Sequence, residues 1–344
     1  MVMAENRRLY DADEETTMTV SRRTLLASLA AAPAAALLSR RAFAAWPERA
    51  IHLIVPFAAG GNADIVGRIV GDVISKGLKQ PVVVENRAGA GGGIGAEIVA
   101  RAAPDGYTLL VGSNGPLTVN PFVQAHLGYD PLKDFAAVAL TSYVPHAIIL
   151  SNKTEAKDIA ALVALSKKAP ITIATSGVGS ATHMTLERFK AATGADVTHV
   201  PYRGGGALLP DVMGGSVNGA MTELSTALPL HKAGQAHIVA IAAAQRSKLA
   251  PDIPTFEESG VKGFIALSFI GILAPAKAPP DIVAQLQKAV ETGLSGGTAV
   301  ERLITLGSDI ATPEQMTSKG FADFIRADYE SMRAAAKLAG ITPQ

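Results

Sequence analysis

Residues 51–77 read IHLIVPFAAGGNADIVGRIVGDVISKG. The apolar run Ile51–Phe57 is typical of a buried strand, and Asp64–Gly77 has the apolar spacing of a helix. Gly60 and Gly61 stand between the two segments, where glycine lets the backbone turn tightly. The stretch therefore predicts a strand that turns directly into a helix.

The same alternation continues along the chain. Further strands are expected at 82–85, 107–112, 147–150, 171–175, 197–201, 217–221 and 237–243. Helices are expected at 94–103, 159–168, 182–193, 207–213 and 226–233. Because parallel neighbours need a crossover between them, this alternation predicts a mainly parallel sheet flanked by helices, the α/β class.

After Pro254 the pattern changes, with one more strand at Ile265–Leu273 and then a helix-rich tail over 280–340. A chain of 344 residues, at about 150 residues per domain, predicts two domains. No low-complexity linker separates them, so we expect two lobes joined by strands that cross near Tyr143–Leu150 and Ala266–Leu273. The predicted boundaries are 46–146 and 269–344 for the first lobe and 147–268 for the second.

Composition excludes several classes of protein. The chain has 31 Lys and Arg against 30 Asp and Glu, 48% hydrophobic residues and no Cys. This is too apolar for a disordered chain and too evenly charged for a nucleic-acid binder, which needs clustered basic residues. The lack of Cys removes disulfide scaffolds, Cys-ligated zinc and thiol nucleophiles.

The N-terminus has the pattern of an export signal. Arg22-Arg23 precedes the apolar run Leu25–Leu38, which has no polar face, and Ala42-Phe43-Ala44 follows it. This predicts a signal peptide over 1–44, cut after Ala44, and paired arginines before an Ala-rich segment resemble the twin-arginine class. Five acids within residues 1–17 are unusual there, and translation starts at either Met1 or Met18.

The predicted mature protein is neutral. Residues 1–44 hold six arginines and five acids, so 25 basic and 25 acidic residues remain. No later segment reaches 18 uninterrupted apolar residues, so the sequence predicts no membrane span in the exported product.

Two glycine-containing turns are candidate anion sites. The first, Pro56–Asp64, runs from a strand end into a helix start, and the second, Thr175–His183, has the same layout in the other predicted lobe with hydroxyls added. Backbone amides at a helix N-terminus bind anions, so two such turns facing each other would grip both ends of a dianion. The alternative is that each is a plain strand-to-helix turn.

Other motifs fit known chemistry less well. The glycine segment Ala88–Ala96 matches a loose dinucleotide fingerprint, but Val111–Asn114 lacks the acid expected at the end of the next strand, so a structural loop is favoured. Gly293–Gly297 matches G-x-S-x-G but follows a predicted helix. The seven histidines show no i, i+4 pair, so we expect no metal site. We also expect no cofactor, and no catalytic residue, since the sequence shows no nucleophile paired with a base.

Several specific segments together resemble a known family. They are Trp46-Pro47-Glu48-Arg49, Val55-Pro56-Phe57 with Gly60-Gly61, Val82–Arg87, Gly89–Gly92, Ala102–Leu110, Tyr129-Asp130-Pro131 with Asp134-Phe135, Val200–Gly204 and Leu273-Ala274-Pro275. From Trp46 to the C-terminus the sequence resembles the Bug family, which are TctC-type periplasmic solute receptors of tripartite tricarboxylate transporters.

The resemblance implies a two-lobed, type II periplasmic binding-protein fold that holds a small organic carboxylate in the cleft between its lobes. Carried over position by position, it implies that the ligand-binding residues are Phe57, Ala58, Gly60, Gly61, Asp64, Ser113, Asn114, Gly115, Ser176, Gly177, Ser180, Ala181, Thr182, Tyr202 and Glu223.

Four of the polar side chains near this cleft have open roles. Asp64 either caps the helix that follows it or touches ligand. Tyr202 lies either in the cleft or in the core with its hydroxyl toward water. Glu223, where the family often has Asp, either meets a cationic group of the ligand or shortens the pocket, and Arg203 either pairs with it or stays solvated.

The sequence thus favours a monomeric, non-catalytic receptor in the periplasm that closes around an organic acid and delivers it to membrane permease subunits. One alternative is a receptor of the same kind that reports to a sensor kinase. Another is an exported enzyme, which needs a nucleophile and a base that the sequence does not show.

Overall fold

The strand, turn and helix expected at residues 51–77 are present in the computed structural model, as β1 (Ile51–Val55) and α2 (Asn62–Leu78). The structure describes residues 46–338 and 343, and Pro47–Gln344 is one compact unit. The predicted signal peptide at 1–44 lies outside the described residues.

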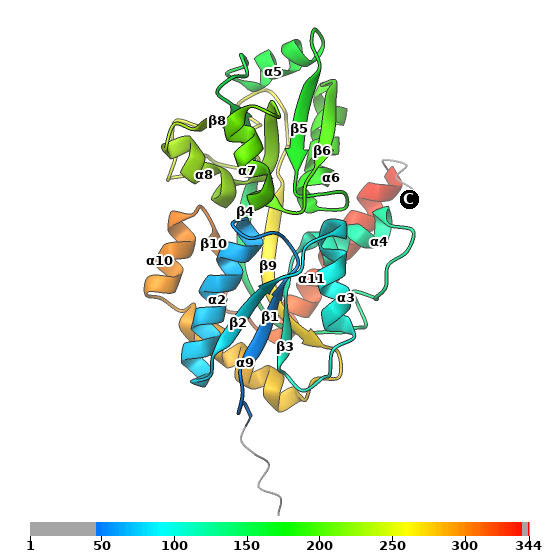
Figure 1. Ribbon diagram of the computed structural model, residues 1–344, viewed down its shortest axis with the longest axis vertical. Coiled ribbons are helices and arrows are strands. Elements are labelled where there is room, and N and C mark those ends of the chain that lie inside the picture. The colour runs from blue at the N-terminus through cyan, green and yellow to red at the C-terminus, as the bar shows by residue number, and fades with distance from the viewer. Residues whose placement is uncertain (1–45, 339–342, 344) are drawn as a thin grey trace, which may run out of the picture. The chain divides into compact units, whose positions relative to one another are not determined.

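One part of the sheet, which we call the first lobe, is built on β1. It pairs in parallel with β2 (Val82–Asn86) on one side and β3 (Thr108–Gly112) on the other. β9 (Leu267–Pro275) then runs antiparallel to β3. The helices of this lobe, seen in the lower half of Figure 1, are α2, α3 (Gly93–Ala100), α4 (Asn120–Val123), α9 (Pro280–Gly293), α10 (Thr298–Thr305) and α11 (Ser318–Leu338).

The second lobe repeats the pattern. β5 (Ile171–Thr175) pairs in parallel with β6 (Val197–Pro201) and β7 (Gly219–Glu223). β8 (Ala236–Ile241) and β7 both run antiparallel to the same strand, β4 (Phe135–Ser151). The helices of this lobe are α5 (Ile159–Ser166), α6 (Ala181–Thr193), α7 (Gly205–Gly214) and α8 (Leu224–Lys232).

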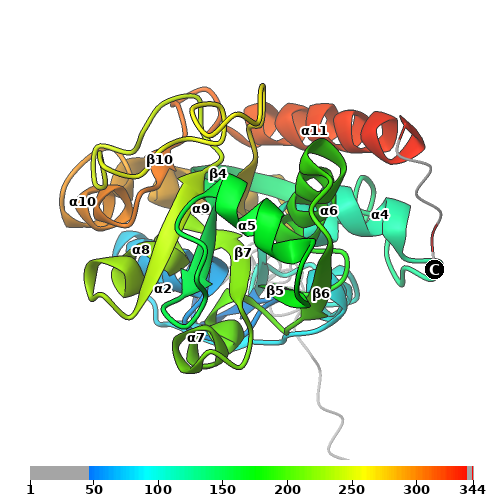
Figure 2. The same cartoon turned by 90° about the horizontal axis from the view of Figure 1, so that it is seen from above.

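Alternate residues of β4 and β7 belong to two separate hydrophobic cores, because successive side chains point to opposite faces of a sheet. Ile148 and Met221 pack with Phe189 of α6 on one face. Ile149 and Ala220 pack with helices α7 and α8 on the other. Figure 2 shows α5 and α6 on one side of the sheet and α7 on the other. Both faces are therefore buried, as in an α/β layer structure.

Strand β4 connects the two lobes. Its residues 135–145 pair with β9, whereas residues 146–151 pair with β7 and β8. Pro145, which has no N–H to donate, stands at the change of partner. We therefore propose lobe boundaries at 145/146 and 266/267, close to the boundaries predicted from sequence.

The predicted strand at 147–150 was too short, because β4 begins at Phe135. Thr141, Ser142 and Pro145 interrupt its apolar pattern, but Thr141 and Ser142 are buried and the strand is completed by antiparallel pairing with β9. The expected α/β class with two lobes is confirmed. A short strand, β10 (Asp309–Ile310), which the sequence did not predict, also pairs with β4.

Candidate functional site

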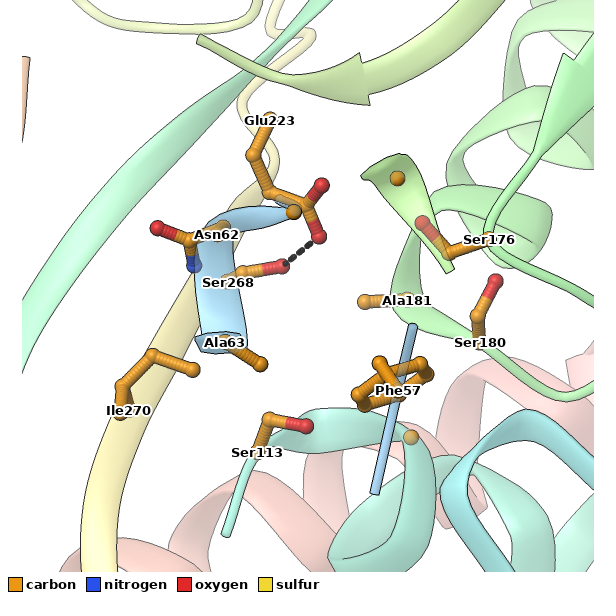
Figure 3. A pocket seen from close by; sticks show the side chains of 13 residues that line it. Phe57, Asn62, Ala63, Ser113, Ser176, Ser180, Ala181, Glu223, Ser268 and Ile270 are labelled. Carbon is orange, nitrogen blue, oxygen red and sulfur yellow. Dashed lines mark hydrogen bonds between the residues drawn. The ribbon is translucent and has the colours of Figure 1, made fainter. Parts of the chain in front are cut away.

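Helices from both lobes begin around one pocket, which we call the inner pocket. α2 contributes Asn62 and Ala63, α6 contributes Ala181, and α7 contributes Gly205. Backbone N–H groups at helix N-termini carry partial positive charge and lack helical partners. The full lining is Phe57, Gly61, Asn62, Ala63, Ser113, Gly115, Ser176, Ser180, Ala181, Gly205, Glu223, Ser268 and Ile270 (Figure 3).

The first turn is held in shape by Asp64. Its buried carboxylate accepts hydrogen bonds from the Gly60 amide at 2.9 Å, from Asn86 Nδ2 at 2.9 Å and from Arg68 Nε at 3.1 Å. Burial raises the pKa of Asp64, but the bonds from Arg68, Gly60 and Asn86 outweigh this and lower it below its usual value. Asp64 does not line the inner pocket, and its contacts position the turn.

The second turn has one hydroxyl group that bonds nothing. Ser180 caps α6 by accepting from the His183 amide, and Thr182 Oγ1 accepts from the Ser176 amide at 3.0 Å. The Ser176 hydroxyl itself is buried and has no hydrogen-bond partner among the described residues. Buried polar atoms normally have partners, so this oxygen is a candidate contact for a polar ligand.

Glu223 ends β7 and is the one acidic or basic side chain in the described lining of the inner pocket. Its Oε2 accepts from Thr222 Oγ1 at 3.2 Å, and its Oε1 lies 3.4 Å from Ser268 Oγ on β9. Burial raises the pKa of Glu223 above its usual value, and the bonds it receives offset this only in part.

Ser268 also contacts a buried histidine on β4. Its hydroxyl lies 2.7 Å from Nε2 of the buried His146 on β4, whose Nδ1 lies 2.7 Å from Thr185 Oγ1 on α6. Burial, together with the positive charge of Arg188, lowers the pKa of His146 to about 3. The imidazole is therefore neutral at any ordinary pH.

A second hollow, the outer pocket, adjoins the inner one and shares Phe57 and Ser176 with it. It has a volume of about 390 Å³ and is lined further by Gly89–Gly92, Gly177, Tyr202 and Arg203. The Tyr202 hydroxyl donates to Asp211 Oδ2 at 2.5 Å. Arg203 is exposed and lines the outer pocket, whereas Glu223 lines the inner one, and no ion pair joins them.

The two lobes touch around the inner pocket. The Ala58 amide donates to the Arg203 carbonyl at 2.8 Å, and the Ser225 hydroxyl donates to Asn62 Oδ1 at 2.9 Å. The inner pocket has a volume of only about 20 Å³. That is room for about one water molecule, so a larger guest has to enter while the lobes are apart.

The structure brings together eight of the predicted ligand-binding residues at the inner pocket: Phe57, Gly61, Ser113, Gly115, Ser176, Ser180, Ala181 and Glu223. Gly177 and Tyr202 line the outer pocket instead. The remaining predicted residues, Ala58, Gly60, Asp64, Asn114 and Thr182, line neither; Asn114, for example, accepts from the Phe269 amide at 3.0 Å.

Sequence reasoning missed five lining residues: Asn62, Ala63, Gly205, Ser268 and Ile270. Asn62 and Ala63 lie inside the first predicted turn, and Gly205 follows the quoted Val200–Gly204 segment. Ser268 and Ile270 are two residues apart on the strand expected to cross between lobes, and this spacing puts them on one face.

Among residues 46–338 and 343, no group of three His, Cys, Asp or Glu side chains is placed to hold a metal ion. No helix within these residues has the length and apolar character required to cross a membrane.

Several known proteins are similar to this chain in sequence, and two of them have solved structures of similar fold. BugT of Bordetella pertussis is 34% identical over 281 residues, which cover 80% of this chain and 86% of BugT. The solved periplasmic binding protein BugD is 31% identical with a TM-score of 0.84, over 87% of this chain and 100% of that one. MatC of Rhodopseudomonas palustris, solved with bound malate, is 32% identical with a TM-score of 0.80, over 85% and 100% of the two chains.

A family model described as the tripartite tricarboxylate transporter family receptor, TctC, matches residues 66–336. The match covers most of the chain and includes both lobes. The chain therefore belongs to the TctC family of tripartite tricarboxylate transporter receptors.

Proposed function

We propose that this protein is a periplasmic receptor that captures a small organic carboxylate between its lobes and delivers it to a tripartite tricarboxylate-type permease. One observation carries the proposal: helix starts from both lobes meet at a pocket in which the Ser176 hydroxyl is buried and unbonded. The malate bound in the related MatC supports the same class of ligand.

The inner pocket contains no Lys, Arg or His among its described lining residues, so positive charge reaches it through backbone dipoles. Each helix N-terminus contributes about 0.3–1 kcal/mol toward an anion, and each hydrogen bond to a charged group about 1.5–3 kcal/mol. A few such bonds, after the cost of ordering ligand and lobes, are compatible with micromolar binding, about −8 kcal/mol.

Capture requires the lobes to separate and close again. Strand β4 and the chain at 266/267, where it enters β9, join the lobes and supply the natural hinge (Figure 1). A ligand shifts the population toward the closed form because only that form completes contacts from both lobes. We infer that the permease recognises the closed surface and that the receptor acts as a monomer.

A thermal-shift screen tests the proposal. The purified protein is heated with several dozen carboxylates, and with neutral sugars and divalent metals as comparison compounds. We expect at least one carboxylate to raise the melting temperature, because a ligand at 100 times its Kd stabilises by about 2.7 kcal/mol. A shift with sugars or metals and with no acid would contradict the proposal.

A further inference from the structure

The charge of Glu223 depends on what its neighbours can donate. A pocket that binds an anion through amide groups is a poor place for an ionised carboxylate, since like charges repel. Among the described residues no basic side chain bonds Glu223, whose two side-chain contacts are the hydroxyls of Thr222 and Ser268. The protonation of Glu223 therefore rests on where these hydroxyl protons point.

The Ser268 hydroxyl lies within hydrogen-bond distance of two acceptors, Glu223 Oε1 at 3.4 Å and His146 Nε2 at 2.7 Å, and the shorter contact favours donation to His146. Thr185 Oγ1 lies 3.0 Å from the Ala181 carbonyl, to which its hydroxyl donates. Its oxygen then accepts from Nδ1–H of His146 at 2.7 Å. His146 is neutral, so its Nε2 carries no proton and accepts the Ser268 hydroxyl at 2.7 Å.

The distances agree with this direction. A hydroxyl that donates to an ionised carboxylate approaches to about 2.5–2.7 Å. Ser268 Oγ lies 3.4 Å from Glu223 Oε1, whereas it lies 2.7 Å from His146. Thr222 Oγ1, at 3.2 Å from Oε2, is also too far for a charge-assisted bond. Both contacts are therefore weak, and they offset only in part the effect of burial on the Glu223 carboxyl.

No other described element places a charged side chain in the lining of the inner pocket. Facing Glu223, α2 brings Asn62, α6 brings Ser180 and Ala181, α7 brings Gly205, and β9 brings Ser268 and Ile270. On β4 the register partner is His146, which is neutral, and the guanidinium of Arg188 on α6 acts on His146. Burial also raises the pKa of the Glu223 carboxyl, which favours the same protonation state.

We propose that Glu223 binds the ligand as a neutral carboxylic acid and donates its O–H to a carboxylate oxygen of the ligand. The inference rests on the proposed function and specifies its ligand class. A donor at this position selects organic acids that present an acceptor, and it disfavours amino acids, whose ammonium group would need an ionised partner. Glu223 is thus a specificity-determining residue of the inner pocket.

Isothermal titration of the full chain and its Glu223→Gln variant tests this. The probes are succinate and malate, with aspartate as the ammonium-bearing counterpart. Glutamine keeps a donor and avoids the cost of protonating Glu223 on closure, so we expect Glu223→Gln to bind a diacid at least as tightly as wild type. Glu301→Gln, an exposed change on α10, is the matched control for loss of one negative charge.

The pH dependence is a second measurement, which remains available if Glu223→Gln does not fold. In the open protein Glu223 meets water and ionises, whereas burial in the closed form raises its pKa. At pH values at which the diacid is fully ionised, wild-type affinity should therefore fall as pH rises, by up to tenfold per pH unit, until the pH reaches the raised pKa of the closed form. The Glu223→Gln profile should be flat over the same range.

Three results would overturn the inference: a loss of more than tenfold in diacid affinity for Glu223→Gln but not Glu301→Gln, a wild-type affinity that is flat or rises with pH, or a preference of wild type for aspartate. If acids bind wild type and one of these results appears, the inference alone fails. If no acid in the titrations or the wider screen binds wild type, the proposed function fails with it.

Discussion

The Ser225 hydroxyl at the start of α8 donates a hydrogen bond of 2.9 Å to Oδ1 of Asn62 at the start of α2, so that the second lobe is bonded to the first beside the inner pocket. Both side chains are buried in this arrangement. When the lobes part, water replaces the bond, so it favours the closed form specifically.

Ser225→Ala should weaken ligand binding without loosening either lobe. Loss of one hydrogen bond costs the closed form about 0.5–1.5 kcal/mol, which corresponds to a fall in affinity of about threefold to tenfold. Titration calorimetry measures the affinity, and small-angle scattering of the ligand-bound sample should show a larger open fraction. Unchanged affinity would mean that the contact does not bias closure.

Gly61→Ala should obstruct closure more strongly. A Cβ on Gly61 would lie 2.9 Å from the Gly206 amide nitrogen and 3.2 Å from that of Gly205, across the junction between lobes. Its φ of −88° suits alanine, so the turn itself is not strained. Overpacking costs about 1–3 kcal/mol, which predicts an affinity loss of about fivefold or more with little change in the melting temperature of the ligand-free protein.

Gly214→Ala on α7 is the matched control for Gly61→Ala, because a Cβ there meets only Ser216 Oγ, at 3.9 Å. It should bind ligand as wild type does. Equal affinities for the two variants would show that the lobes tolerate a methyl group at their junction.

Ser176→Ala should weaken ligand binding without lowering the free energy of unfolding. The hydroxyl is buried without a partner, so its removal should leave the free energy of unfolding unchanged or raise it by up to about 1 kcal/mol. A bond from this hydroxyl to a carboxylate is worth about 1.5–3 kcal/mol, so ligand affinity should fall at least tenfold. Ser295→Ala, at an exposed position, should change neither quantity appreciably. If Ser176→Ala is destabilised but binds ligand with normal affinity, the hydroxyl stabilises the lobe and does not contact the ligand.

Asp64→Ala should destabilise the first lobe in a pH-dependent way. Because the pKa of Asp64 is lower in the folded protein, its contribution is complete above its ordinary pKa near 3.8 and is lost as pH falls below that value. At neutral pH we expect a loss of about 1–3 kcal/mol in the free energy of unfolding, measured by urea denaturation. The difference from wild type should shrink in acid.

Asp72→Ala is the control for Asp64→Ala on the same helix. Its carboxylate is exposed and pairs only with Lys76, so the change should stay within about 1 kcal/mol at every pH. A similar loss in both variants would indicate a general effect of charge on α2.

The sequence alone determined the local elements. The predicted strands at 171–175 and 197–201 have the bounds of β5 and β6, and the two glycine turns lie where strand meets helix at the inner pocket. These features depend on residue periodicity and on glycine, which act over a few neighbouring residues. Family resemblance added the proposed ligand class and most of the pocket lining.

Only the tertiary structure decided which polar groups meet. Asp64 turns to Gly60, Arg68 and Asn86 instead of the pocket, and Tyr202 bonds Asp211. Glu223, Ser268, His146 and Thr185 come from four separate elements, and their contacts depend on strand register and on the angle at which the lobes close. Such long-range geometry leaves no periodic signal in the chain, because it is fixed by how elements distant in sequence pack together.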